Sequence, residues 1–108
     1  MEFSRPEVAP LVKIGKIARR LRITGIVQGV GYRAALCSAA QARRVDGWVR
    51  NRRDGSVEAE VAGAPEAVAA LLDWAKRGPP AAQVADVHVE PIDPGVEHAG
   101  GFTQRPTV

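Results

Sequence analysis

The sequence predicts a single α+β domain in which two helices cover one face of an antiparallel sheet. Segments with a period of two residues alternate with two segments of helical period that are rich in alanine and leucine. Glycine or proline separates most of these segments. The chain has 108 residues, which leaves room for one core at roughly 100–200 residues per domain.

The first half of the chain contributes a strand, a helix and a second strand. Apolar and charged residues alternate over 17–24, which predicts a half-buried strand. The alanine-rich segment 33–44 predicts a helix, and it ends on two arginines that complement the negative end of a helix. A second strand is expected over 45–51, and the pair Asp54-Gly55 after it predicts a tight hairpin turn.

The second half completes the sheet. Valine and alanine alternate with glutamate over 56–62, which predicts a third strand with the glutamates pointing outward. A second helix is expected to begin at Pro65 and to stop before Gly78. A fourth strand is expected over 84–92, and a short final strand can open at Phe102. The order β-α-β-β-α-β, with room for a short fifth strand, is that of a ferredoxin-like α/β sandwich.

Charge is distributed unevenly along the chain. Eleven of the fifteen basic residues and one acid lie in 13–53, whereas nine acids lie in 54–104. The usual strand order of this fold, 4-1-3-2, makes the basic first strand a neighbour of the acidic third strand. Opposite charges across a ladder contribute about 0.2–1 kcal/mol per pair, so we expect a structural ion-paired face rather than a free basic patch. The side chains concerned are Arg20 and Arg22 on one strand and Glu58 and Glu60 on the other.

Composition excludes several classes of protein. Cys37 is the single cysteine, so the chain can form neither an internal disulfide nor a thiolate cluster. No apolar run approaches the roughly 18–20 residues that span a bilayer. Residues 1–10 have neither the apolar core nor the basic start of a signal peptide. We interpret 1–16 as a flexible leader before a domain over 17–108. We therefore expect a cytoplasmic protein.

The loop between the first strand and the first helix is the strongest candidate site. It reads Gly-Ile-Val-Gln-Gly-Val-Gly-Tyr-Arg over 25–33. Its glycines allow successive backbone N–H groups to line one concavity beside a helix N-terminus, which is an anion site. Arg33 is a cation at the positive end of the helix dipole, which is unfavourable unless a negative group lies between the two. A bound phosphate would interact favourably with both the guanidinium and the helix N-terminus. A plain glycine-rich turn with Arg33 in solvent remains the alternative at this point.

Asn51 is the second candidate, because it ends the second strand. The first and second strands are expected to run parallel on either side of the third strand, so their C-terminal ends lie at one end of the sheet, about 10 Å apart. A phosphate and a water fit in that gap, and an amide side chain can bind both. The alternative is an ordinary turn asparagine. His88 and Glu90 share a strand face, but we expect a surface location there rather than a metal site.

These residues resemble the acylphosphatase family. Its diagnostic stretch is similar to residues 25–33, and its second stretch is similar to Gly-Trp-Val-Arg-Asn over 47–51, followed by Asp-Gly-x-Val-Glu over 54–58. The similarity covers roughly 19–92. It implies hydrolysis of small acyl phosphates to a carboxylate and inorganic phosphate by a monomer that needs no metal or other cofactor, no nucleic acid and no membrane.

The resemblance also implies residue roles. Arg33 corresponds to the catalytic arginine of the family and Asn51 to the asparagine that positions water. The phosphate cradle corresponds to the backbone of a run of five residues: Gln28, Gly29, Val30, Gly31 and Tyr32. Two positions depart from the family pattern, since Arg44 replaces a glycine near the end of the first helix and Arg52 replaces a small hydroxyl residue after the asparagine.

Two other functions fit the same topology. RNA-recognition domains stack bases on aromatic side chains of the two central strands, but 17–24 and 56–62 contain no aromatic residue, and 56–62 carries two glutamates. Accessory domains that bind an anion without turnover occur fused to larger maturation enzymes. With 108 residues the chain has no room for such a partner, so we expect a free enzyme.

Overall fold

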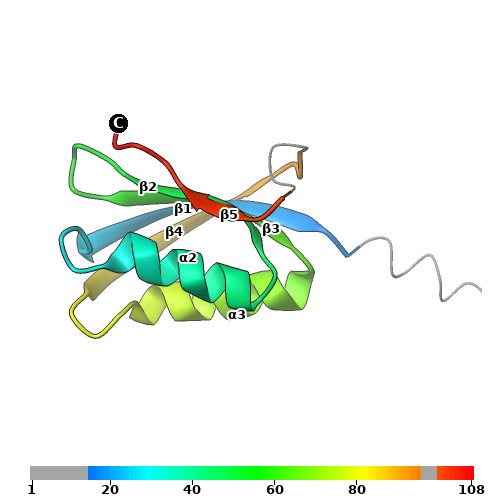
Figure 1. Ribbon diagram of the computed structural model, residues 1–108, viewed down its shortest axis with the longest axis horizontal. Coiled ribbons are helices and arrows are strands. Elements are labelled where there is room, and N and C mark those ends of the chain that lie inside the picture. The colour runs from blue at the N-terminus through cyan, green and yellow to red at the C-terminus, as the bar shows by residue number, and fades with distance from the viewer. Residues whose placement is uncertain (1–14, 96–99) are drawn as a thin grey trace, which may run out of the picture.

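Two helices lie side by side on one face of a five-stranded sheet in the computed structural model, which describes residues 15–95 and 100–108 (Figure 1). The predicted ferredoxin-like arrangement is confirmed. Most of the leader expected over 1–16 lies outside the described residues. The elements are, in chain order, β1 (Ile17–Ile26), α2 (Tyr32–Ala42), β2 (Asp46–Asn51), β3 (Val57–Gly63), α3 (Pro65–Arg77), β4 (Gln83–Ile92) and β5 (Phe102–Gln104).

The strands follow the order β4-β1-β3-β2-β5. Both β1 and β2 pair antiparallel with β3, while β5 adds to the outer edge of β2 as a parallel strand. Because β1 and β2 are both antiparallel to β3, they run in the same direction. Their C-terminal ends, Ile26 and Asn51, therefore lie at the same end of the sheet, as predicted.

The core fills the space between the sheet and the helices. Inward side chains alternate along the strands with outward ones, and each helix contributes one apolar stripe. Burying each large apolar side chain stabilises the fold by about 1.5–3 kcal/mol. The fully buried members include Leu21, Ile23, Val49, Val57 and Val61 from the sheet and Leu36, Val68 and Leu71 from the helices. Neither helix of the described residues is long and apolar enough to cross a membrane.

Helix α2 ends earlier than predicted. It stops at Ala42, so the two arginines follow its last turn instead of completing it. Arg44 has φ of 57°, the left-handed conformation in which the chain leaves a helix. Arg43 still stabilises the helix end, because its Nη1 donates to the Ala39 carbonyl at 3.0 Å.

The open face of the sheet carries ion pairs, as predicted, but its two glutamates are buried instead of pointing into solvent. Glu58 and Glu60 are only 8% and 5% exposed, because arginine side chains lie over them. Arg20 donates to Glu60 Oε2 through Nε at 3.0 Å and Nη2 at 2.6 Å. Arg22 is opposite Glu58 in the register, yet its ion pair is with Asp54 at 3.5 Å.

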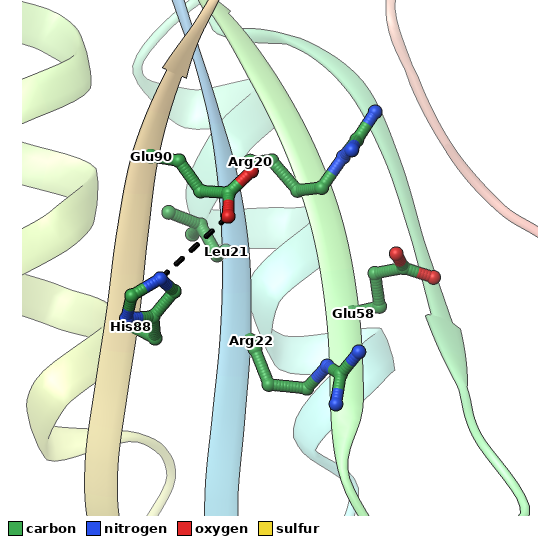
Figure 2. Close-up of a pocket in the computed structure, with 6 residues that line it drawn as sticks. All are labelled: Arg20, Leu21, Arg22, Glu58, His88 and Glu90. Atoms are coloured by element: carbon green, nitrogen blue, oxygen red, sulfur yellow. Dashed lines mark ion pairs between the residues drawn. The ribbon is translucent and has the colours of Figure 1, made fainter.

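Glu58 is held from the other side. It accepts hydrogen bonds from Arg50 Nε at 2.8 Å and from Arg52 Nη1 at 3.1 Å. Figure 2 shows the Glu58 carboxylate turned away from β4. His88 and Glu90 lie across the intervening hollow of about 300 Å³, with 3.6 Å between His88 Nε2 and Glu90 Oε2. Their side chains are 66% and 51% exposed, so the expected surface location is confirmed.

Glu58 makes the stability of the fold depend on pH. Burial raises its pKa, but the hydrogen bonds from Arg50 and Arg52 outweigh burial and hold the pKa below its ordinary value. A carboxyl with a lowered pKa stabilises the fold above its unfolded pKa of about 4.3, and this stabilisation is lost as the pH falls through the folded pKa. We expect Glu58→Gln to lower the free energy of unfolding by about 1–3 kcal/mol at neutral pH and by much less near pH 3.

Urea denaturation at both pH values measures this difference. Glu90→Gln is the matched control, since the Glu90 side chain is half exposed and its ion pair with His88 has a long N–O distance of 3.6 Å. An equal effect of the two substitutions, or an effect of Glu58→Gln that is the same at both pH values, contradicts the assignment.

The backbone of Arg44 has a conformation that is strained for arginine but not for glycine. It is the one non-glycine residue with a positive φ in the described ranges. We expect Arg44→Gly to raise the free energy of unfolding by roughly 0.5–1 kcal/mol, because glycine has no Cβ to clash in this conformation. Arg43→Gly should instead lower the free energy of unfolding, since φ of Arg43 is −101° and its side chain donates a hydrogen bond to the Ala39 carbonyl. Thermal unfolding of the two variants beside the parent measures both, and a lower Tm for Arg44→Gly contradicts the prediction.

Candidate active site

A small pocket lies where the end of β1, the start of α2 and the end of β2 meet. Its volume is about 130 Å³, well below the roughly 300–1,000 Å³ of pockets that enclose drug-sized ligands. The pocket therefore suits a small anionic group with the rest of the ligand outside. The residues that line it are Val27, Gly29, Gly31, Tyr32, Arg33, Ala34, Asn51 and Gln104.

The loop turns its backbone toward the pocket because two glycines adopt left-handed conformations. Gly29 has φ of 76° and Gly31 has φ of 81°, values that residues with a Cβ rarely adopt. Gly31 also caps the N-terminus of α2, without a side-chain hydrogen bond to the helix. An anion can therefore approach the end of the helix directly.

The backbone donors of this loop are free within the described part of the chain. No N–H of residues 28–31 donates to a protein acceptor there, whereas the Gly31 carbonyl accepts from Ala35 N at 3.0 Å. The first N–H groups of α2 have no partner within the helix by its geometry. These donors and the positive end of the helix dipole together form an anion-binding concavity.

Arg33 stands in the first turn of α2 and lines the pocket. The first turn holds no acidic residue, and in the described ranges the Arg33 guanidinium has no hydrogen bond or ion pair with the protein. It is partly buried rather than fully in solvent. A cation held next to unpaired N–H groups leaves a strongly positive concavity, which a bound oxyanion would neutralise.

Asn51 reaches the same pocket from β2. The register pairs Asn51 with Val57, and Val57 belongs to the buried core beneath the helices, so Asn51 projects to the side where α2 begins. Its Oδ1 is buried and has no hydrogen-bond partner. A buried acceptor without a partner is costly, so Asn51 is suited to bind a water or a ligand donor.

Strand β2 is paired on both sides near Asn51. Arg105 N–H donates to Val49 O at 2.8 Å, and Val108 N–H donates to Asn51 O at 3.2 Å. Gln104, at the end of β5, lines the pocket beside Asn51. Sequence reasoning missed Gln104, because only the parallel pairing of β5 with β2 brings it there, and a three-residue strand carries no signal for its partner.

The five residues expected to form the cradle are not equivalent. Gly29, Gly31 and Tyr32 line the pocket, while Val30 packs against the core. The Tyr32 side chain points away, because its hydroxyl donates to Ala75 O at 2.8 Å and burial raises its pKa above the ordinary range. The Gln28 side chain is also engaged elsewhere, since its Nε2 donates to the carbonyls of Arg52 at 2.7 Å and Ser56 at 2.8 Å.

Arg52 does not enter the pocket with its side chain. The guanidinium lies on the open face of the sheet, where its Nη1 binds Glu58, while Asn51 lies on the helical face. The arginine that departs from the family pattern at position 52 therefore points away from the Asn51 side chain.

The chain is similar to known proteins over most of its length. The family model for acylphosphatase matches residues 19–103. An acylphosphatase of Acidovorax sp. (strain JS42) is 55% identical over 92 residues, which cover 85% of this chain and 93% of the relative. The solved acylphosphatase from Coxiella burnetii superposes with a TM-score of 0.79 at 31% identity, over 86% of this chain and 96% of that chain.

A similar domain also occurs inside a larger protein. Full-length HypF in its phosphate- and nucleotide-bound form superposes with a TM-score of 0.76 at 29% identity. The superposition covers 85% of this chain but 12% of the HypF chain.

Proposed function

The chain belongs to the acylphosphatase family and hydrolyses acyl phosphates, and we propose that it does so in the pocket formed by the loop 27–31, Arg33 and Asn51. One observation carries this assignment. The loop, Arg33 and Asn51 line one pocket, and among the described residues the loop N–H groups, the Arg33 guanidinium and the Oδ1 of Asn51 have no protein partner. The arrangement offers one place for a phosphoryl group and one for water.

The phosphoryl group is held by charge and by directed hydrogen bonds. The N–H groups of the loop and the first turn of α2 bind its oxygens, and Arg33 grips two oxygens with its planar guanidinium. Phosphoryl transfer needs chiefly positioning and stabilisation of charge on these oxygens. Donors fixed by Gly29 and Gly31 need little reorganisation when the charge develops.

Water attacks phosphorus from the side of Asn51. The Oδ1 of Asn51 accepts a hydrogen bond from the water and so orients its lone pair toward phosphorus. The new bond joins the water oxygen to phosphorus, and the bond between phosphorus and the acyl oxygen breaks. The carboxylate leaves with the electron pair without needing a proton, and a phosphoryl oxygen of the substrate accepts the proton of the water. The products are a carboxylate and inorganic phosphate.

We propose a metal-independent reaction, because Arg33 and the backbone donors supply the positive charge. We further propose a cytoplasmic monomer that acts on small acyl phosphates and not on nucleic acid. Trp48 is 5% exposed, and the guanidinium groups of Arg50 and Arg105 lie over its ring at 4.8 and 4.6 Å from the ring centre, so it offers no stacking surface for a base. Cys37 carries a thiol rather than a disulfide, in keeping with a reducing compartment.

Hydrolysis of benzoyl phosphate in the presence of EDTA tests metal independence. We expect kcat and KM to be unchanged by the chelator, because no step uses a metal. The measurement is the loss of benzoyl phosphate absorbance with and without EDTA, followed by addition of Mg²⁺. Activity that is lost with EDTA and restored by Mg²⁺ contradicts the proposal.

The two assigned residues should differ in their kinetic signatures. Arg33→Gln should raise KM and reduce kcat by about a thousandfold, because Arg33 binds the phosphoryl group in both ground and transition states. Asn51→Ala should reduce kcat by roughly a hundredfold to a thousandfold with a small change in KM, because Asn51 acts on the water. Steady-state kinetics on benzoyl phosphate separate the two effects. An Asn51→Ala enzyme with the parent kcat would rule out the role assigned to Asn51.

A further inference from the structure

We propose that the Gln28 side chain is a positioning residue that fixes the distance between the phosphate-binding loop and Asn51. The side-chain amide of Gln28 does not itself bind substrate. The inference rests on the proposed site. It concerns how two parts of that site from different segments of the chain, the phosphate-binding loop and Asn51, are kept at a fixed distance.

One amide nitrogen joins the loop to the β2–β3 hairpin. Gln28 Nε2 donates to the carbonyl of Arg52 at 2.7 Å and to that of Ser56 at 2.8 Å. Both N–H hydrogens of the amide are thereby used. Arg52 directly follows Asn51, and Ser56 directly precedes β3. The two hydrogen bonds therefore join the loop to both ends of the β2–β3 turn, and we call this pair of bonds the Gln28 clasp.

The hairpin offers a rigid partner. Arg52 N–H donates to Ser56 O at 2.9 Å, and Gly55 N–H donates to Arg52 O at 3.1 Å. The Asp54 carboxylate accepts from Ser56 N at 2.9 Å and from Ser56 Oγ at 2.6 Å. A displacement of the loop therefore cannot be absorbed by the turn, and it is transmitted to Asn51.

The loop has little else to hold it against the hairpin. Within the described ranges, its side chains and N–H groups over 27–31 make no other hydrogen bond to protein, and the Gly31 carbonyl bonds Ala35 in its own helix. Val27 is buried in the core and Val30 packs against the core, so both anchor the loop through apolar contacts, which are not directional. Loss of the Gln28 clasp leaves the conformation of the phosphate-binding loop intact, but the distance between this loop and Asn51 is no longer fixed.

That distance decides how well the attacking water is aligned. A misplacement of about 1 Å can cost roughly a hundredfold in rate, whereas the phosphate donors belong to the loop and α2 and move together. The clasp should therefore affect kcat much more than phosphate binding.

A double-mutant cycle with Gln28→Ala and Asn51→Ala tests this coupling. We expect Gln28→Ala alone to lower kcat by about tenfold to a hundredfold, with less than about a threefold change in KM for benzoyl phosphate or in Ki for inorganic phosphate. In the Asn51→Ala background the same substitution should lower kcat by less than about threefold, because residues that act through one another are not additive.

Gln41→Ala is the matched control. Gln41 is also a glutamine whose Nε2 donates to a backbone carbonyl, that of Phe102 at 3.3 Å, but this bond lies at the other end of α2 from the pocket. Its kcat should equal that of the parent. If Gln28→Ala does not fold, as judged by thermal unfolding, Gln28→Glu replaces it, since an ionised carboxylate of nearly the same shape cannot donate.

Gln28→Glu also gives a pH signature. Its kcat relative to the parent should rise as the pH falls toward the carboxyl pKa of about 4.3, because protonation restores one donor. A parent kcat in either Gln28 variant, or losses that multiply fully in the double mutant, overturns the role of Gln28 while leaving Asn51 in place. A parent kcat in Asn51→Ala overturns the site assignment itself, and with it the role of Gln28.

Discussion

The antiparallel pairing of β3 with both of its neighbours is the constraint on which the site depends. It forces β1 and β2 to run in the same direction, so that the loop after β1 and the last residue of β2 meet at one end of the sheet (Figure 1). All seven residues of β3 are buried. A slip of one residue in its pairing with β2 would turn Asn51 to the open face, because strand side chains alternate.

The alternation of β2 assigns its two faces to different tasks. Arg50 points to the open face, and its guanidinium binds the buried carboxylate of Glu58. Asn51 points to the helical face and into the pocket. Arg52, after the strand, binds Glu58 again. The residues before and after Asn51 are thus tied to β3 by charge-assisted hydrogen bonds, which fix the position of the Asn51 side chain better than a mobile loop would.

Local patterns were sufficient to predict the elements, and topology was sufficient to predict that Arg33 and Asn51 lie close together. Arg33 and Asn51 line one pocket, as expected from the parallel directions of β1 and β2. Strand β1 continues two residues beyond its predicted end, because a register shift at Thr24/Gly25 lets the pairing with β4 continue past a glycine. Helix α2 ends two residues before the predicted end, because Arg44 takes a left-handed conformation. The alanine-rich pattern does not show this, and the one sequence signal for it is the glycine that the family has at this position.

What the sequence did not reveal depends on contacts between distant residues. The Gln28 clasp joins positions 24 and 28 residues apart, and Gln104 reaches the pocket through pairing of β5 with β2. The burial of Glu58 and Glu60 was missed for a related reason. Alternation places a side chain on a face, but it does not say whether long arginine stems from neighbouring strands will cover that face.

A cation in the first turn of a helix usually costs about 0.3–1 kcal/mol, because it opposes the helix dipole. Here Arg33 and the unpaired N–H groups face the same small volume. The repulsion between the Arg33 guanidinium and the N–H groups is relieved only when negative charge enters the pocket. It is relieved most when the charge on the phosphoryl oxygens is greatest. The free energy that stabilises the rest of the fold thus maintains a site whose donors are already oriented for a phosphoryl group. The same arrangement explains why the loop needs an external clasp, since a loop that spends its own N–H groups on substrate cannot use them to hold itself in place.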